Sequence, residues 1–161
     1  LLSKKEDIED LFFLPFFTGI GSPHWKSEAQ GAIIGLTRGT TRNDISRACL
    51  EGIALSVNDS IQALTADSDT KVDSICVDGG ASMNNFLLQL QSNFSDKKII
   101  RPVVIETTAY GVALGSLVGC NLISLDEIKN LWKEDQSFTP KNEPYFSTKL
   151  AKWKKLIEKI Y

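Results

Sequence analysis

The sequence predicts an α/β fold, in which short strands and helices alternate along the chain and pack in layers. Four apolar runs of strand length are bounded by turn-forming residues, and longer stretches repeat apolar residues every three or four positions, as helices do. A strand, a pair of glycines and a helix also follow one another directly, which is typical of α/β proteins. With 161 residues, of which 42% are hydrophobic, residues 1–161 are long enough for one domain with its own core.

The first part of the chain predicts two short strands separated by a loop. Lys4–Asp10 is charged and fits a short helical turn or a frayed lead-in. Leu11–Phe17 is densely apolar, but a proline within it disfavours a central place in a sheet, so we expect an edge strand. Thr18–Gln30 is rich in glycine and proline and should form a loop, with Trp25 packed under it. Gly31–Leu36 is the second expected strand.

The longest predicted helix begins after Thr41, which is placed to cap it, with Asp44 three residues further on. Glu51 lies in the middle of this helix, one turn after Arg47, so the two side chains can pair. We therefore expect a structural role for Glu51 rather than a catalytic one. The expected buried face consists of apolar residues at helical spacing: Ile45, Cys49, Ile53, Val57, Ile61 and Leu64.

The centre of the chain, Lys71–Asn93, predicts a buried strand, a glycine turn and a helix. Gly79 and Gly80 allow positive φ and let a ligand approach the main chain. The polar residues that follow favour a helix start, so free N–H groups should point outward and form a site for an anion or a nucleotide. Taken alone, the same pattern also fits a tight turn with no ligand.

The last third predicts one more strand and three helices. Lys98–Val104 is a strand interrupted by proline, and Glu106–Thr108 should cap a helix of small residues. Because small side chains permit close approach, we expect this helix to pack flat against the sheet or against Lys71–Asn93. The remaining segments are a short helix, a polar loop and an amphipathic helix: Asp126–Lys133, Ser137–Pro144 and Tyr145–Tyr161.

Composition argues against several classes of function. The net charge is −2 with both signs interspersed, and the lysines near the end alternate with apolar residues, so nucleic-acid binding is not expected. No apolar run approaches the roughly 20 residues of a membrane-spanning helix. The first residues have neither an initiator methionine nor a signal peptide, so the sequence is expected to lie within a longer protein.

Cysteine and histidine usage predicts a cytoplasmic protein without a metal site. Cys49, Cys76 and Cys120 each lie in an apolar context and are expected to be buried, reduced thiols. His24 is the only histidine, and there is no CxxC pair, so a zinc site is not expected.

Four stretches resemble motifs of the FGGY carbohydrate kinases, and within that family the glycerol kinases most closely. They appear in the family's order and cover about Leu14 to Leu122. Two of them depart from the usual pattern, with Gln30 in place of an arginine and Val112 in place of an alanine. The stretches are Pro15–Trp25 (PFFTGIGSPHW), Gly31–Gly39 (GAIIGLTRG), Asp78–Ser92 (DGGASMNNFLLQLQS) and Glu106–Ala113 (ETTAYGVA).

The resemblance implies a ribonuclease-H-like fold, shared with actin and Hsp70-type ATPases. Residues 1–161 would be most of the C-terminal lobe, without its first strands and without the N-terminal lobe. The sheet would then be incomplete and leave an edge to be covered, swapped or paired with another chain.

The resemblance also implies function. ATP would lie with its purine and ribose against Gly79, Gly80, Ala81 and Asn84, and Asp78 would orient the turn or hold a water near the phosphates. The full enzyme would transfer the γ-phosphate of ATP to glycerol, giving sn-glycerol 3-phosphate, with Mg²⁺ bound largely outside this chain. It is expected to close around its substrates and to form a homo-oligomer. The catalytic base and most glycerol contacts would lie in the missing part, so this chain alone should be inactive.

Two other classes of function stay open at this point. One is the same lobe of a different kinase, such as a xylulose or gluconate kinase. The Asn84-Asn85-Phe86-Leu87 start of the helix favours glycerol. The other is a non-catalytic module, either an actin-like nucleotide-binding domain or an interaction domain with a vestigial glycine turn.

Overall fold

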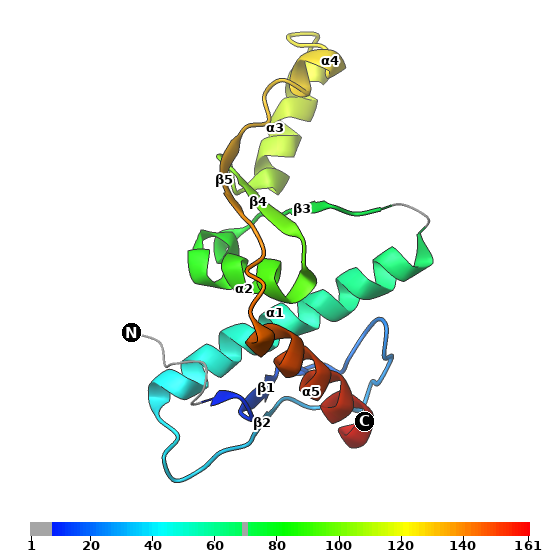
Figure 1. The fold of residues 1–161 in the computed structure, drawn as a ribbon. Helices are drawn as coiled ribbons and strands as arrows, with labels where there is room; N and C mark the ends of the chain where they lie inside the picture. The colour runs from blue at the N-terminus through cyan, green and yellow to red at the C-terminus, as the bar shows by residue number, and fades with distance from the viewer. Residues whose placement is uncertain (1–7, 69–70) are drawn as a thin grey trace.

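The computed structural model describes residues 8–68 and 71–161, which form a mixed α/β structure (Figure 1). In chain order the elements are β1 (Phe12–Leu14), β2 (Ala32–Ile34), α1 (Arg42–Asp67), β3 (Ser74–Cys76), the 3-10 helix η2 (Gly80–Met83), α2 (Asn85–Ser95), β4 (Lys98–Pro102), α3 (Thr107–Gly119), α4 (Leu125–Ile128), β5 (Glu134–Phe138) and α5 (Pro144–Ile160). The four strands expected from the sequence are all present. The helical turn expected at Lys4–Asp10 lies mostly outside the described residues.

The strands form two small sheets with α1 and α2 between them (Figure 1). β1 and β2 pair antiparallel, with Phe13 opposite Ile33. In the other sheet β4 is central, parallel to β3 and antiparallel to β5. Within the described residues the other edge of β3 has no partner strand, so this sheet is incomplete, as expected.

Two apolar clusters hold these layers together, and α2 contributes to both. Leu87, Leu90 and Phe94 of α2 belong to the larger cluster, which lies on the first sheet and is closed by α5. Leu88 faces the other way, onto Ile99 and Phe138 of the second sheet. Trp153 is fully buried in the larger cluster, with ring contacts to Phe12 and Phe16. α2 therefore packs on both sheets and connects the two halves of the structure.

Helix α1 confirms the predicted cap but not the predicted buried face. Thr41 and Asp44 form a capping box. However, Ile53, Val57 and Leu64 are 38%, 37% and 64% exposed. The helix instead buries small and polar residues, because β1, α2 and α5 approach it on that side: Ala48, Glu51, Gly52, Ala54, Leu55, Asn58 and Asp59.

The segment after β4 departs most from expectation. Leu114 is the one buried residue of α3, and α3 and α4 project from the body (Figure 1). The prediction that α3 packs flat is wrong, because no described element lies against its small residues. β5 was also missed. It occupies Glu134–Phe138, directly after the helix that was expected to end at Lys133. Its last two residues fall in the polar loop that was expected to begin at Ser137. The predicted short helix is a single turn, α4, capped by Ser124.

Four side chains expected to be buried are exposed or only half-buried. Cys76 and Cys120 are exposed and Cys49 is half-buried, although all three are free thiols. Cys76 is uncovered because β3 is an edge strand among the described residues. Trp25 is 75% exposed instead of packing under its loop.

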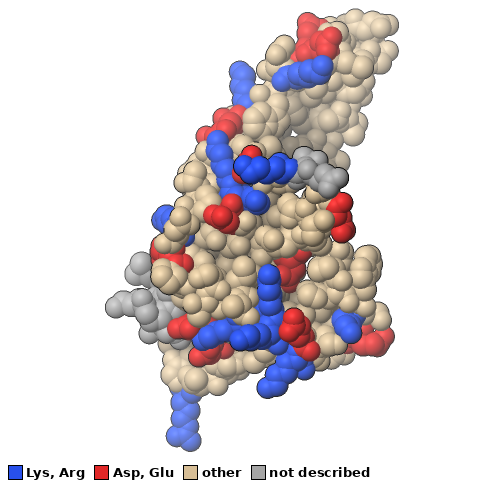
Figure 2. Space-filling view, turned by 45° about the vertical axis from the view of Figure 1, so that its right-hand side comes forward, with Lys and Arg blue, Asp and Glu red and all other residues tan. Residues whose placement is uncertain are grey.

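Charges of both signs are intermixed over the visible face, whereas the projecting end around α3 is mostly uncharged (Figure 2). Among the described residues, no helix combines the length and the apolarity needed to cross a membrane.

Candidate functional site

The glycine turn lies where β3 ends and is tied to the end of β4. The amide of Val77 donates to the carbonyl of Ile100 at 2.9 Å, which extends the parallel ladder one residue past β3. Gly79 follows with φ +75°, a backbone conformation that disfavours other residues. Its amide donates to the carbonyl of Ile105 at 2.8 Å. The sequence therefore needs glycine here so that the chain can turn away from the sheet.

The turn continues as η2 and is closed internally. Both the amide and the hydroxyl of Ser82 donate to the carbonyl of Gly79, at 3.0 and 2.7 Å. The amides of Gly80 and Ala81 make no hydrogen bond to any described residue. A Cβ added at Gly79 or Gly80 would meet nothing within 4 Å. The corner is thus open to solvent, with main-chain donors available and no apolar group filling it.

Asn84 lies between the turn and α2, and the two polar atoms of its side chain, Oδ1 and Nδ2, differ in their contacts. Its Oδ1 accepts from the amides of Phe86 and Leu87, each at 3.1 Å, and so caps α2. These two amides are therefore not free, which corrects the expectation that the first N–H groups of the helix point outward. The Nδ2 of Asn84 has no hydrogen-bond partner within the described residues, and the residue is exposed. Asn84 can therefore offer two donors to a ligand while it caps the helix.

Asp78 is held by the start of α3. The hydroxyl of Thr107 donates to Oδ2 of Asp78. This contact and the bond from Gly79 to Ile105 fasten the turn to the β4–α3 connection. The structure thus brings together Asp78, Gly79, Gly80, Ala81 and Asn84 at one corner, with Thr107 beside them. The segment containing Thr107 was recognised as a motif, but its contact with Asp78 was not predicted.

Arg101 also takes part in the site, which was not expected from the sequence. It lies on β4 and is 7% exposed. Its Nη1 donates to the carbonyl of Ser82 at 3.0 Å and to Oδ1 of Asn85 at 2.7 Å. A charged residue at an inward position of a short strand is unusual enough to signal such a role. Its partners in the turn could not be inferred from spacing.

A pocket of about 250 Å³ opens beside the corner, between β3 and α2. Asp78, Ala81 and Ser82 line one side of it and Leu88 and Gln91 the other. Oε1 of Gln91 is buried and has no hydrogen-bond partner among the described residues. The pocket therefore combines apolar and polar lining residues, and one of them, Gln91, has a buried oxygen that lacks a donor among the described residues.

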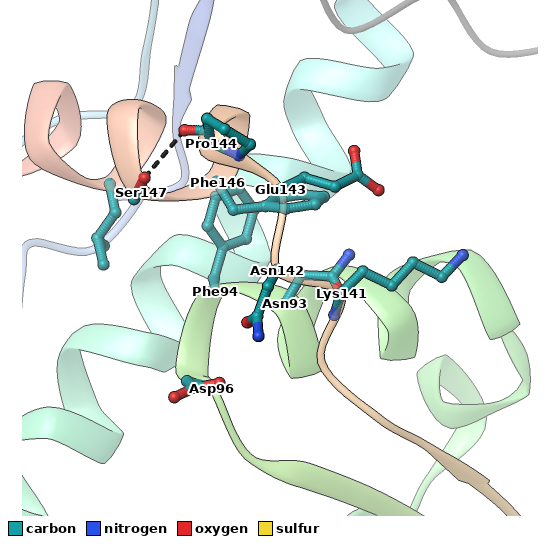
Figure 3. Close-up of a pocket in the computed structure, with 10 residues that line it drawn as sticks. Asn93, Phe94, Asp96, Lys141, Asn142, Glu143, Pro144, Phe146 and Ser147 are labelled. Atoms are coloured by element: carbon teal, nitrogen blue, oxygen red, sulfur yellow. Dashed lines mark hydrogen bonds between the residues drawn. The ribbon is translucent and has the colours of Figure 1, made fainter.

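A second pocket, of about 370 Å³, lies at the opposite end of α2 (Figure 3). It is formed where the β5–α5 connection passes the end of α2, with Phe94 and Phe146 packed edge to face at 5.3 Å. Asn93 joins the two segments, since its Oδ1 accepts from the amide of Lys141 at 2.9 Å. None of the expected nucleotide-binding residues lines this pocket, and we give it no role in the candidate site.

A buried polar cluster around Glu51 is also separate from the corner. Glu51 is 1% exposed and receives Nε of Arg47 at 3.0 Å, the pair expected from the sequence. The hydroxyl of Tyr145 donates to both of its oxygens, at 2.9 and 2.8 Å. Burial and the charge of Glu51 raise the pKa of Tyr145 well above its ordinary value. Glu51 is thus enclosed by protein partners, as a structural role requires.

No group of three or more histidine, cysteine, aspartate or glutamate side chains among the described residues could hold a metal ion. The groups that the corner presents to a ligand are hydrogen-bond donors, an apolar wall and one carboxylate. This set suits the positioning of a nucleoside or a phosphate, since its one carboxylate, that of Asp78, already accepts from Thr107.

Comparison with known proteins gives consistent matches. Residues 1–120 match the FGGY family of carbohydrate kinases, C-terminal domain. Glycerol kinase of Haloferax volcanii is 43% identical over 160 residues, which are 99% of this chain and 31% of the relative. Glycerol kinase of Clostridium perfringens strain SM101 is 43% identical over 159 residues, which are 98% of this chain and 32% of the relative. The chain thus spans about a third of the length of these curated relatives.

Solved structures give the same picture of the fold. Plasmodium falciparum glycerol kinase with ADP superposes with a TM-score of 0.81 and 31% identity, covering 96% of this chain and 32% of that one. A ligand-bound xylulose kinase from Lactobacillus acidophilus has a TM-score of 0.79 at 22% identity, covering 97% of this chain and 32% of that one. The second likeness concerns the fold alone.

Proposed function

The chain belongs to the FGGY family of carbohydrate kinases and has the ribonuclease-H-like α/β fold of its C-terminal lobe, and from this premise we propose that it forms the nucleotide-binding wall of a glycerol kinase. The whole protein would transfer the γ-phosphate of ATP to glycerol and release sn-glycerol 3-phosphate and ADP. The observation that carries this proposal is the open corner at Gly79–Ala81, where the amides of Gly80 and Ala81 and the nearby Nδ2 of Asn84 have no hydrogen-bond partner among the described residues.

In this proposal the corner positions the nucleotide. Gly79, Gly80 and Ala81 present bare backbone, on which a flat purine or a ribose can lie. Asn84 donates to an edge of the base or the sugar. Asp78, fixed by Thr107, sets the direction of the turn or orients a water near the phosphates. The adenine nucleotide is taken from the family resemblance and from the ADP bound to the Plasmodium relative.

The chemistry itself needs groups that the described residues do not supply. Phosphoryl transfer requires Mg²⁺, neutralisation of the phosphates and a group that takes the hydroxyl proton. The described residues do not fit a metal site, so Mg²⁺ would be held by the phosphates and by residues outside them. We therefore assign no catalytic base here. We propose that residues 1–161 are part of a C-terminal lobe and that a cytoplasmic, homo-oligomeric protein contains the other lobe.

A xylulose or gluconate kinase is the alternative with a specific observation behind it. Such kinases have nearly the same fold, with TM-scores of 0.79 and 0.78. Their identities are 22%, whereas the glycerol kinases reach 43% over almost the whole chain. The difference favours glycerol as the phosphate acceptor.

The test of nucleotide binding uses Gly80→Arg. The arginine side chain would occupy the open corner, so ADP affinity measured by isothermal titration calorimetry on the intact protein should fall by at least about tenfold. Gly119→Arg is the matched control, since Gly119 is also an exposed glycine with nothing within 4 Å but lies at the end of α3, outside the four motifs. Equal ADP affinity in Gly80→Arg and wild type would refute the site. Phosphorylation of glycerol in preference to xylulose and gluconate tests the substrate.

A further inference from the structure

The side chain of Arg101 donates hydrogen bonds to residues that follow the glycine turn of the candidate site. Its guanidinium presents five N–H donors in a fixed, planar fork. Nη1 is shared between the carbonyl of Ser82, inside η2, and Oδ1 of Asn85, the first residue of α2. Asn84 lies between these two contacts in the chain. Arg101 therefore holds the main chain before Asn84, at Ser82, and the side chain of the residue after it, Asn85.

The other end of the guanidinium is fixed by β5. Nε donates to Oδ2 of Asp135 at 2.8 Å, and Nη2 lies 2.7 Å from the same oxygen. Nη2 also donates to Oε1 of Gln136 at 3.0 Å. The arginine side chain is only 9% exposed, whereas that of Asp135 is 47% exposed, so the charge-assisted bonds between them lie at the edge of the buried region. β5 thus orients Arg101, and Arg101 in turn orients the turn.

The other hydrogen bonds of Asn84 join it to its sequence neighbours. Its amide donates to the carbonyl of Ala81 at 3.1 Å, and its Oδ1 caps α2. Gly79 is tied to Ile105, and Ser82 is bonded back to Gly79. None of these hydrogen bonds joins residues 82–85 to β4, whereas those of Arg101 do. Loss of the arginine fork would let this local unit shift relative to β4, and a shift of about 1 Å is enough to weaken a polar contact severely.

We propose that Arg101 is a positioning residue for nucleotide recognition, acting through Ser82 and Asn85 on Asn84. It does not contact the nucleotide. Asp135 and Gln136 belong to the same device, because they hold the fork in register with the turn. This inference rests on the proposed function and deepens it by naming the groups that set the geometry of the site.

The experiment measures ADP affinity by calorimetry on the intact protein. Arg101→Lys keeps the charge but cannot reproduce the fork. We expect affinity to fall about tenfold, the scale at which supporting residues act on a site. Lys98→Met is the matched control, because Lys98 lies on the same strand and pairs across to β5, with Glu134, at 3.6 Å, but does not reach the turn. Its affinity should stay within about twofold of wild type.

A double-mutant cycle separates positioning from general stability. Asn84→Ser keeps an oxygen that can cap α2 but removes the Nδ2 donors. If Arg101 acts through Asn84, adding Arg101→Lys to this background should reduce ADP affinity by less than about twofold further. A second full tenfold loss would overturn the inference, since it would mean direct contact with the ligand or loss of the fold. Asp135→Asn, combined with Asn84→Ser in the same way, replaces Arg101→Lys if that variant does not fold.

The proposed function and the role of Arg101 can be refuted separately. If wild-type protein does not bind ADP, the proposed function is wrong. If wild type binds ADP and Gly80→Arg does not, but Arg101→Lys binds as wild type does, only the role of Arg101 is refuted.

Discussion

Lys149 shows most clearly how a single residue in this chain can connect distant segments. It lies on α5, is fully buried, and belongs to the same polar cluster as Glu51. Its Nζ donates to three main-chain carbonyls, those of Ile8, Leu11 and Glu9, at 2.6, 2.7 and 3.2 Å. It also lies 3.6 Å from Oε2 of Glu51 and 4.2 Å from the centre of the Phe12 ring. The ammonium group thus fixes the chain just before β1 to the last helix.

The ionisation of Lys149 predicts a pH dependence of stability. Burial lowers the pKa of Lys149 from 10.5 to about 8, although the carboxylates of Glu51 and Asp10 oppose the shift, and the ammonium of Lys152 adds to it. Between these two values the unfolded chain keeps a proton that the folded chain has lost. The free energy of unfolding should therefore rise with pH across this range, by at most about 3 kcal/mol.

Urea unfolding at about pH 7 and about pH 9.5 checks this prediction. The upper pH stays below 10, the ordinary pKa of a tyrosine such as Tyr145. Lys149→Met should be destabilised by roughly 3 kcal/mol at pH 7, because the carbonyls and Glu51 lose their partner, and its stability should not rise with pH through this group. Lys154→Met, at an exposed position of the same helix, should keep the rise. An unchanged rise in Lys149→Met would attribute the effect to other groups.

At the residue scale, local chemistry was predictable and distant chemistry was not. The turn at Gly79, the box of Thr41 with Asp44 and the pair of Arg47 with Glu51 all join residues within four positions. Lys149 bonds to a residue 141 positions away, and Arg101 to one 34 positions away. Nothing in the spacing of the sequence records such contacts, because they exist only once the tertiary structure has formed.

Among the elements, α1 is placed by a glycine that has no room for a side chain. A Cβ at Gly52 would overlap the main-chain carbonyl of Phe13, so this glycine lets α1 lie directly on β1. Gly115 is also within a helix, α3, but has nothing within 4 Å. The two positions therefore separate close packing from intrinsic helix propensity.

Replacing each of these glycines by alanine should have opposite effects. Gly52→Ala should lower the free energy of unfolding by about 1–3 kcal/mol, because the overlap forces α1 away from β1. Gly115→Ala should raise it by about 0.5–1 kcal/mol, since alanine favours the helix and meets no obstacle. Chemical denaturation of both variants beside wild type gives the two values. A stabilised Gly52→Ala would show that α1 and β1 are not in close contact.

The elements also show where periodicity stops being informative. The four expected strands were found because their apolar residues form short, bounded runs. β5 was missed because three of its residues, Glu134, Asp135 and Gln136, are polar and exposed, and it is held by pairing with β4. The buried face of α1 was missed because it uses alanine, glycine and a polar cluster, while larger apolar residues lie outside.

For the whole molecule, apolar side chains are exposed on several elements. They include Ile53, Val57 and Leu64 on α1 and Val112, Leu122 and Leu125 around α3 and α4, besides loop residues such as Phe17 and Trp25. Single exposed apolar residues are ordinary, whereas those around α3 and α4 lie on a part of the chain that projects from the body (Figure 1). The relatives are about three times as long as this chain.

At this scale we predict that the 161-residue chain alone produces no sn-glycerol 3-phosphate from ATP and glycerol, because it offers one wall of the site and no base. A coupled assay of ADP release, run beside an intact glycerol kinase as a positive control, measures this. Glycerol-dependent turnover by the isolated chain, abolished in Gly80→Arg, would contradict the prediction and place the catalytic groups within these residues.

The bond between Lys149 and the residues that precede β1 also bears on biosynthesis. During translation, β1 and β2 leave the ribosome more than a hundred residues before the helix that covers them. Until α5 emerges, the carbonyls of Ile8 and Leu11 have no ammonium partner, and Phe12 and Phe16 have no Trp153 to pack against. β1 and β2 are therefore completed only after α5 has been made, and the nascent chain depends on that helix to cover them.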